Sequence, residues 1–226
     1  AQGVTDIVID FRYNGGGLVS TAELMGDLLG RNRTSSELFS RTDFRPSKAA
    51  ENDRHFFASQ PESIAPTRIA FIGTGSTASA SELVANSLIP YLGSNLALVG
   101  ANSFGKPVGQ FGFDLAACDL RVRAVAFRTV NAAGQGDYYT GLASVMPNTC
   151  RAGDDITFPL GDPREASIAA ALNFLGGRSC SPITSGGTAS ALGGPTQSDT
   201  TFGGADLPER EPLQPRRPNP AQHELP

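Results

Sequence analysis

Four hydroxyl residues stand in the stretch GSTASASE, residues 75–82, directly before an apolar run. Its end, from Ser79 to Glu82, matches the S-x-x-E capping box that begins many helices, and a purely structural role would account for it. A turn from a strand into a helix also points backbone N–H groups outward beside the positive end of the helix dipole. An alkoxide and an oxyanion would both be stabilised there. The stretch therefore allows either a helix cap or a nucleophilic serine.

A nucleophilic serine needs a base, and this chain offers few candidates. Of the two histidines, His223 lies close to the C-terminus and His55 stands beside two phenylalanines, where packing is the simpler role. A lysine can serve as base where burial favours its neutral form. Lys48 lies in the charged stretch RPSKAAENDR, whereas Lys106 follows an apolar run in NSFGKPVGQ, which has few charges. Lys106 is therefore the better candidate for the base, with ordinary surface exposure as the alternative.

A third candidate element is DFRYNGGG, residues 10–17, at the end of another apolar run. Glycines at a strand end let the backbone approach a substrate and leave N–H groups for an oxyanion. A tight turn or a phosphate-binding loop is the alternative, but neither GxxxxGK[ST] nor GxGxxG spacing is present. Because ligand sites in α/β sheets lie at the carboxyl ends of strands, we expect this loop, Ser79 and Lys106 to converge.

The elements that would position these residues follow from periodicity. Continuous apolar runs predict buried parallel strands at residues 5–11, 68–72 and 96–100. Alternation at residues 121–129 predicts a half-exposed strand, and residues 31–66 are polar and irregular. The order of strands and helices favours a layered α/β fold with a mixed, largely parallel sheet and right-handed crossovers.

Three helices are predicted from capping signals and apolar spacing. The first begins at a capping box formed by Ser20 and Glu23, and the second runs from about Ser79 to Leu92. The last begins at Asp162 as cap, with a proline at its first position, and ends near residue 176.

Composition limits the classes of function. The 226 residues are 39% hydrophobic, which suits one globular domain, predicted at residues 1–180. Residues 181–226 hold 8 of the 16 prolines and little that could be buried, which predicts a disordered tail. The net charge of −4 argues against a nucleic-acid partner, and no apolar run is long enough to span a membrane. The chain opens almost within a strand and without Met, so we expect its upstream part to be missing.

The three cysteines, Cys118, Cys150 and Cys180, lack the close spacing of a zinc site, and with only two histidines no metal is expected. They are interpreted either as buried thiols or as a Cys118–Cys150 disulfide formed in an oxidising compartment. In the second case Cys180 would be the odd cysteine, either free or paired with a segment outside this sequence.

Three motifs in one order make a more specific pattern than any of them alone. DFRYNGGG, STASASE and NSFGKPVGQ resemble D-L-R-x-N-x-G-G, S-A-S-A-S-E and T-F-G-K-G-x-x-Q of the C-terminal processing peptidases, or tail-specific proteases. The resemblance covers roughly residues 3–175. It implies a fold similar to the crotonase and Clp protease core and a peptidase with a serine/lysine dyad. It implies a polypeptide substrate, no cofactor, and a periplasmic or secreted location.

The resemblance also implies roles for single residues. The nucleophile of the family corresponds to Ser79, its general base to Lys106, and the glutamine that orients the lysine to Gln110. The oxyanion would be held by the N–H groups of Ala80 and Gly16, with Gly17 as the second choice for the loop donor.

One departure from the family's motifs affects the base. Pro107 replaces the glycine after the lysine, which removes an N–H and could shift this loop. Two rival functions remain open: a non-catalytic binding module of the same fold, and another crotonase-like or Clp-like enzyme. The oligomeric state is not predicted.

Overall fold

The computed structural model describes residues 3–184, apart from the side chain of Ala116. Its first sheet, sheet A, has four parallel strands in the order β1-β4-β5-β8. Their bounds are Asp6–Asp10 for β1, Arg68–Gly73 for β4, Leu96–Gly100 for β5 and Asn148–Arg151 for β8. The first three were predicted from their apolar runs and are confirmed. β8, with the sequence NTCR, is short and polar and was not predicted.

The second sheet, sheet B, is antiparallel in the order β3-β2-β7-β6. Its strands are Leu38–Phe44 (β2), Asp53–Phe56 (β3), Val108–Leu115 (β6) and Leu120–Val130 (β7). Only β7 was predicted. The interpretation of residues 31–66 as irregular was wrong, because this segment forms β2 and β3. Most side chains of these two strands are half-buried or exposed, so their sequences lack a continuous apolar run.

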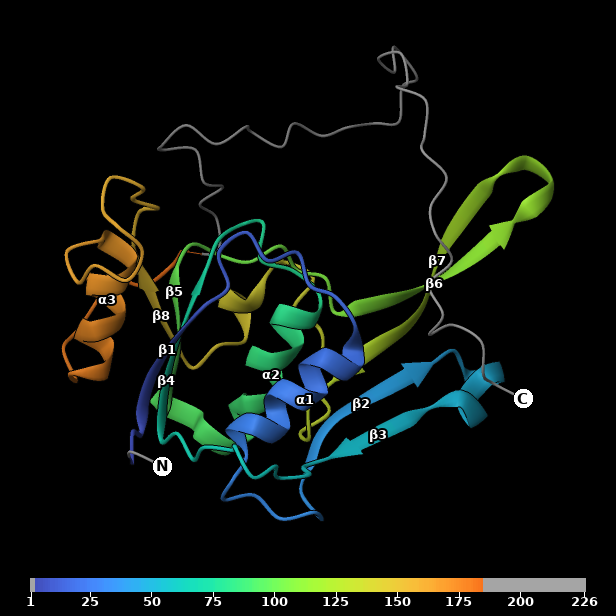
Figure 1. Cartoon of the computed structure of the whole chain (residues 1–226), viewed down its shortest axis with the longest axis horizontal. Helices are drawn as coiled ribbons and strands as arrows, with labels where there is room; N and C mark the ends of the chain where they lie inside the picture. Colours follow the sequence, from blue (N-terminus) through green and yellow to red (C-terminus); the bar gives the residue numbers. More distant parts are fainter. Residues whose placement is uncertain (1–2, 185–226) are drawn as a thin grey trace, which may run out of the picture. The chain divides into compact units, whose positions relative to one another are not determined.

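The helices are Val19–Leu29 (α1), Ala80–Leu92 (α2) and Ala166–Leu175 (α3). α3 covers one face of sheet A, while α1 and α2 lie side by side against the other (Figure 1). α2 also contacts β2 and β7 of sheet B. The predicted layered α/β fold is thus confirmed, with its parallel and antiparallel strands divided between two sheets.

Two predicted helix starts were wrong, and in each case a carboxylate has a different partner. α1 begins at Val19, and Glu23 lies near Ser40 of β2 (3.4 Å) instead of closing a capping box. α3 is capped by Glu165, which accepts the N–H groups of Ser167 and Ile168. Asp162, the predicted cap, forms an ion pair with Arg164 in the preceding turn.

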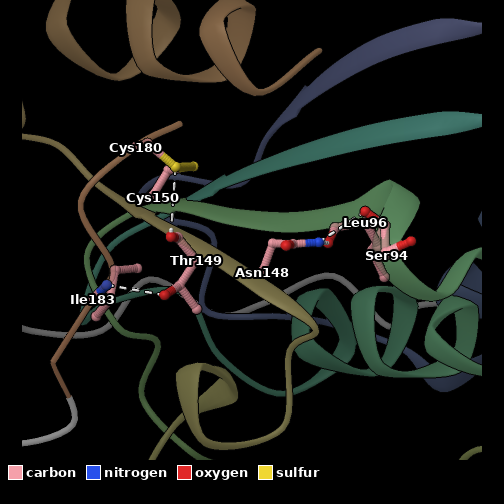
Figure 2. The surroundings of a disulfide bond; sticks show 7 residues. All are labelled: Ser94, Leu96, Asn148, Thr149, Cys150, Cys180 and Ile183. Carbon is pink, nitrogen blue, oxygen red and sulfur yellow. Dashed lines mark hydrogen bonds between the residues drawn. A yellow bond between two sulfur atoms is a disulfide. The ribbon is translucent and has the colours of Figure 1, made fainter. Parts of the chain in front are cut away.

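Cys150 and Cys180 form a disulfide between β8 and the segment after α3, with their Cα atoms 5.2 Å apart (Figure 2). The alternatives of a Cys118–Cys150 bond and of buried thiols throughout are therefore wrong. Cys118 is an exposed free thiol in the β6–β7 turn of sheet B, whereas Cys150 is buried in sheet A. The return of the chain after α3 brings Cys180, and not Cys118, to β8.

Replacing Cys180 with serine is expected to lower the free energy of unfolding by about 3 kcal/mol, because the disulfide closes a loop with a sequence separation of 30. Urea denaturation at equilibrium would measure this loss. Cys118→Ser is the matched control and should leave the midpoint unchanged. Equal stability of Cys180→Ser and the parent protein would contradict the assignment.

The core extends slightly past the predicted boundary at residue 180. Arg151 donates its N–H to the carbonyl of Ser181 (2.7 Å), and Ile183 donates its N–H to the hydroxyl of Thr149 (2.9 Å; Figure 2 draws the second bond). Residues 181–183 therefore lie along β8. The predicted disordered tail falls, from residue 185 onward, outside the described residues. None of the described helices has both the length and the apolar character needed to span a membrane.

Candidate active site

The three predicted elements meet at the carboxyl edge of sheet A. Because β1, β4 and β5 are parallel neighbours, the segments that follow them leave from the same edge (Figure 1). The carbonyl of Asn14, after β1, accepts the N–H of Ala78, after β4, at 3.1 Å. The carbonyl of Thr77 accepts the N–H of Phe104, after β5, at 2.9 Å. The predicted convergence is confirmed by these backbone bonds.

Ser79 stands directly before α2, with a backbone φ of 58°. A positive φ is strained for a serine and typically costs about 1–3 kcal/mol, so the surrounding contacts must hold it. The neighbouring hydroxyls have structural partners: Thr77 donates to the carbonyl of Phe11 (2.7 Å) and Ser81 to the carbonyl of Asn14 (3.2 Å). Thr77 and Ser81 are buried, whereas Ser79 remains partly exposed. Of these three, Ser79 is best placed to reach a substrate.

Glu82 joins the serine turn to the lysine loop. One of its carboxylate oxygens, Oε2, accepts the backbone N–H groups of Ser79 and Lys106, each at 2.8 Å. These two nitrogens therefore cannot lie farther apart than twice that distance. The other oxygen, Oε1, accepts the Gly105 N–H (2.7 Å) and the Ser103 hydroxyl (2.6 Å).

The Glu82 side chain is fully buried, at 0% exposure. Four donors satisfy the carboxylate, which is the condition under which a buried anion is tolerated. From the sequence, Glu82 was predicted only as the end of a capping box. Its second role depends on the Lys106 loop, more than twenty residues later, which no local pattern can indicate.

Lys106 is half-buried between Gly105 and the buried Pro107. Within residues 3–184 no carboxylate forms an ion pair with its ammonium group. Lys48 is exposed in the 3-10 segment Pro46–Glu51 next to β2. Lys106 is therefore the lysine that the fold brings to Ser79.

Gln110 lies on β6 and is exposed, directly after a register shift in the pairing of β6 with β7. In the described part of the chain no hydrogen bond joins its side chain to that of Ser79 or Lys106. Gln110 thus lies on the strand that continues from the lysine loop, but it forms no side-chain hydrogen bond to the lysine among the described residues.

Gly16 packs directly against the serine turn. It has a φ of 100°, and a Cβ atom built on it would lie 2.6 Å from the Cβ of Ser79 and 2.8 Å from the nitrogen of Ala80. Only glycine fits this position. The Gly16 N–H donates to the side-chain oxygen of Asn14 (2.9 Å), whereas the N–H groups of Gly17 and Ala80 have no acceptor among the described residues.

A charge network anchors the glycine loop to the start of α3. The guanidinium of Arg12 contacts Asp10 (2.7 Å), Glu165 (3.1 Å) and Asp154 (3.2 Å), and the hydroxyl of Tyr13 donates to Asp154. The hydrogen bond to Asp10 raises the pKa of Arg12, and that to Asp154 raises the pKa of Tyr13. This network was not predicted from the sequence, because Asp154 and Glu165 lie more than 140 residues along the chain from Arg12 and Tyr13.

His55 has partners away from the serine. Its Nε2 lies 3.0 Å from a carboxylate oxygen of Asp27 in α1, and its ring packs edge-on against Phe39 of β2. This matches the packing role expected for it.

Residues 1–141 match the sequence profile of peptidase family S41. No functionally curated protein matches the chain. A solved Bacteroides fragilis structure assigned to the S41 proteases is 25% identical, with a TM-score of 0.68, over 77% of this chain and 46% of that one. A Parabacteroides merdae structure assigned as a peptidase is 16% identical, with a TM-score of 0.53, over 76% and 52% of the two chains, and shows similarity of fold alone.

The photosystem II D1 C-terminal processing protease is also similar, at 25% identity and a TM-score of 0.49, over 66% of this chain and 36% of that one. The chain thus spans about half the length, or less, of each of these structures.

Proposed function

Because this chain belongs to peptidase family S41, we propose that it is a serine endopeptidase with Ser79 as nucleophile and Lys106 as general base. The observation that carries the proposal is the Glu82 carboxylate, which binds the backbone N–H groups of both residues. It holds the two residues close together on segments that are far apart in the sequence.

In the proposed mechanism, neutral Lys106 takes the proton of the Ser79 hydroxyl as its oxygen attacks the substrate carbonyl. The C–N bond breaks once the lysine returns the proton to the leaving amine, which leaves an acyl-enzyme on Ser79. Water activated by the same lysine then releases the acid product. Gln110 is proposed to orient the lysine during this cycle.

Two backbone N–H groups are proposed to hold the oxyanion that forms on the carbonyl, a contribution typically worth about 3 kcal/mol each. Ala80 supplies one, because its N–H is free at the first position of α2, where the helix dipole also favours negative charge. The glycine loop supplies the other. Since the Gly16 N–H is occupied by Asn14, the free N–H of Gly17 is the better-supported donor, and Gly16 provides the close packing.

The substrate is proposed to be a polypeptide that is cleaved near its C-terminal tail. The support is the ordered set of three motifs that resembles the tail-specific proteases. A periplasmic or secreted location is proposed with it, since a disulfide such as Cys150–Cys180 persists in an oxidising compartment.

Covalent labelling with an acylating probe tests the nucleophile directly. We expect one adduct, located by peptide mass spectrometry on Ser79, and none in a Ser79→Ala variant. Ser81→Ala is the matched control, because Ser81 lies two residues away and its hydroxyl bonds to Asn14. A non-catalytic binding module would leave Ser79 unlabelled, and an adduct on another serine would refute the assignment.

A further inference from the structure

The hairpin formed by β6 and β7 is longer than the sheet that supports it. β2 pairs with β7 only where Phe44 to Arg41 face Phe127 to Val130. Beyond that point, from Phe111 to Ala124, no other strand within residues 3–184 pairs with the hairpin. Figure 1 shows it projecting away from the sheets and helices. A two-stranded ribbon is only marginally stable in water unless something covers one of its faces.

One face of this ribbon is apolar and uncharged. Its cross-strand pairs are Phe111 with Ala124, Phe113 with Val122, and Leu115 with Leu120. Their exposed fractions show that the face is uncovered: Phe113 and Leu120 are each 56% exposed, Val122 is 48% and Leu115 is 46%. We call these six residues the ribbon face.

The opposite face carries the charges. There Asp114 forms an ion pair with Arg121 (2.7 Å between Oδ2 and Nη2), and Arg123 stands opposite Gly112. The ribbon is thus amphipathic although both its faces are exposed. Such a pattern is typical of a strand pair whose apolar face is covered and whose charged face remains in water.

We propose that the ribbon face packs against the same face of a second copy of this chain. A two-fold contact brings identical surfaces together, which suits a face that carries no charge to select or exclude a partner. Face-to-face packing of two sheets would supply the layer that each ribbon lacks. The half-exposed side chains would bury on the order of 1,000 Å² in the pair, which reaches the lower limit for a specific interface. The partner is therefore a second copy, held by apolar contact.

Sedimentation of the protein over a range of concentrations tests the proposal. We expect a reversible dimer, and we expect Phe113→Glu to raise its dissociation constant at least about thirtyfold, as loss of a central apolar contact does. Phe113 is exposed in the monomer, so the variant should fold, and its far-UV circular dichroism should match the parent's. Arg123→Ser, on the opposite face, is the matched control and should dimerise normally.

A mixing experiment identifies which surfaces meet. Phe113→Glu and Phe113→Lys should each be monomeric alone and should form a mixed dimer together. Phe113 stands in the middle of the three cross-strand pairs, so in the proposed contact it lies nearest the two-fold axis and faces its own copy. A monomeric parent, a Phe113→Glu variant that still dimerises, or a mixture that stays monomeric would overturn the proposal. Binding of a monomeric parent to phospholipid vesicles would also overturn it, by assigning the ribbon face to a membrane surface.

Discussion

Replacing Lys106 with alanine is expected to reduce the hydrolysis of a denatured protein substrate roughly a thousandfold or more, the range expected for loss of a general base. Lys106 lies beside the Ser79 turn, and no other lysine or histidine among residues 3–184 is held there. The loss should appear in kcat, since the alanine removes no residue proposed to bind the substrate. Ser79→Ala should lower the rate as much, because the two residues act as a unit.

Lys48→Ala is the matched control for this prediction. It removes an exposed lysine beside β2 and should leave hydrolysis unchanged. Circular dichroism should show that all three variants are folded. Parent-like turnover in Lys106→Ala would exclude the serine/lysine dyad, while the labelling of Ser79 would show separately whether the serine is still reactive.

Replacing Glu82 is expected to have the largest effect on the fold of the site. Glu82→Ala leaves four buried donors without their acceptor, so we expect the free energy of unfolding to fall by about 3–5 kcal/mol. Glu82→Gln keeps the shape but places an NH₂ group against two of those donors. It should therefore also destabilise the protein. Urea denaturation would measure both losses.

A second measurement separates positioning from stability. At low temperature, denaturation curves should show that the Glu82→Gln variant is folded. Turnover per folded molecule should still fall at least about tenfold, because either the Ser79 and Lys106 N–H groups or the donors of the lysine loop then lose their acceptor. Glu23→Gln is the matched control. Glu23 is a half-buried residue of α1, and its replacement should change neither the free energy of unfolding nor the turnover per folded molecule strongly. If each folded Glu82→Gln molecule turned over substrate as fast as the parent, Glu82 would have a structural role only.

Patterns confined to a few neighbouring residues allowed much of the fold to be predicted. β4 and β5 are almost entirely buried and the middle of the edge strand β1 is half-buried, so each appears as an unbroken apolar run. α2 begins where the S-x-x-E pattern places it, because Glu82 does accept the N–H of Ser79. The order of these elements was enough to predict that three loops meet at one sheet edge, since parallel strands share the direction in which they end.

Short polar strands could not be predicted in this way. β2, β3 and β8 are held by pairing with strands distant in the sequence, and their residues are not continuously apolar. The same physical reason explains why the predicted Cys118–Cys150 disulfide was wrong. Spacing along the chain does not reveal that α3 returns Cys180 to β8 while Cys118 stands in the turn of the other sheet.

Sequence alone thus determined which residue types are available for the chemistry: a serine at a helix start, one lysine in a loop of few charges, and a run of glycines. Only the tertiary structure decided how they are held. It placed Glu82 between Ser79 and Lys106 and bound the Gly16 N–H to Asn14. It left the N–H groups of Gly17 and Ala80 without an acceptor in the described part of the chain. A local pattern indicates which secondary structure a segment prefers, whereas a hydrogen bond between distant segments exists only once the chain has folded.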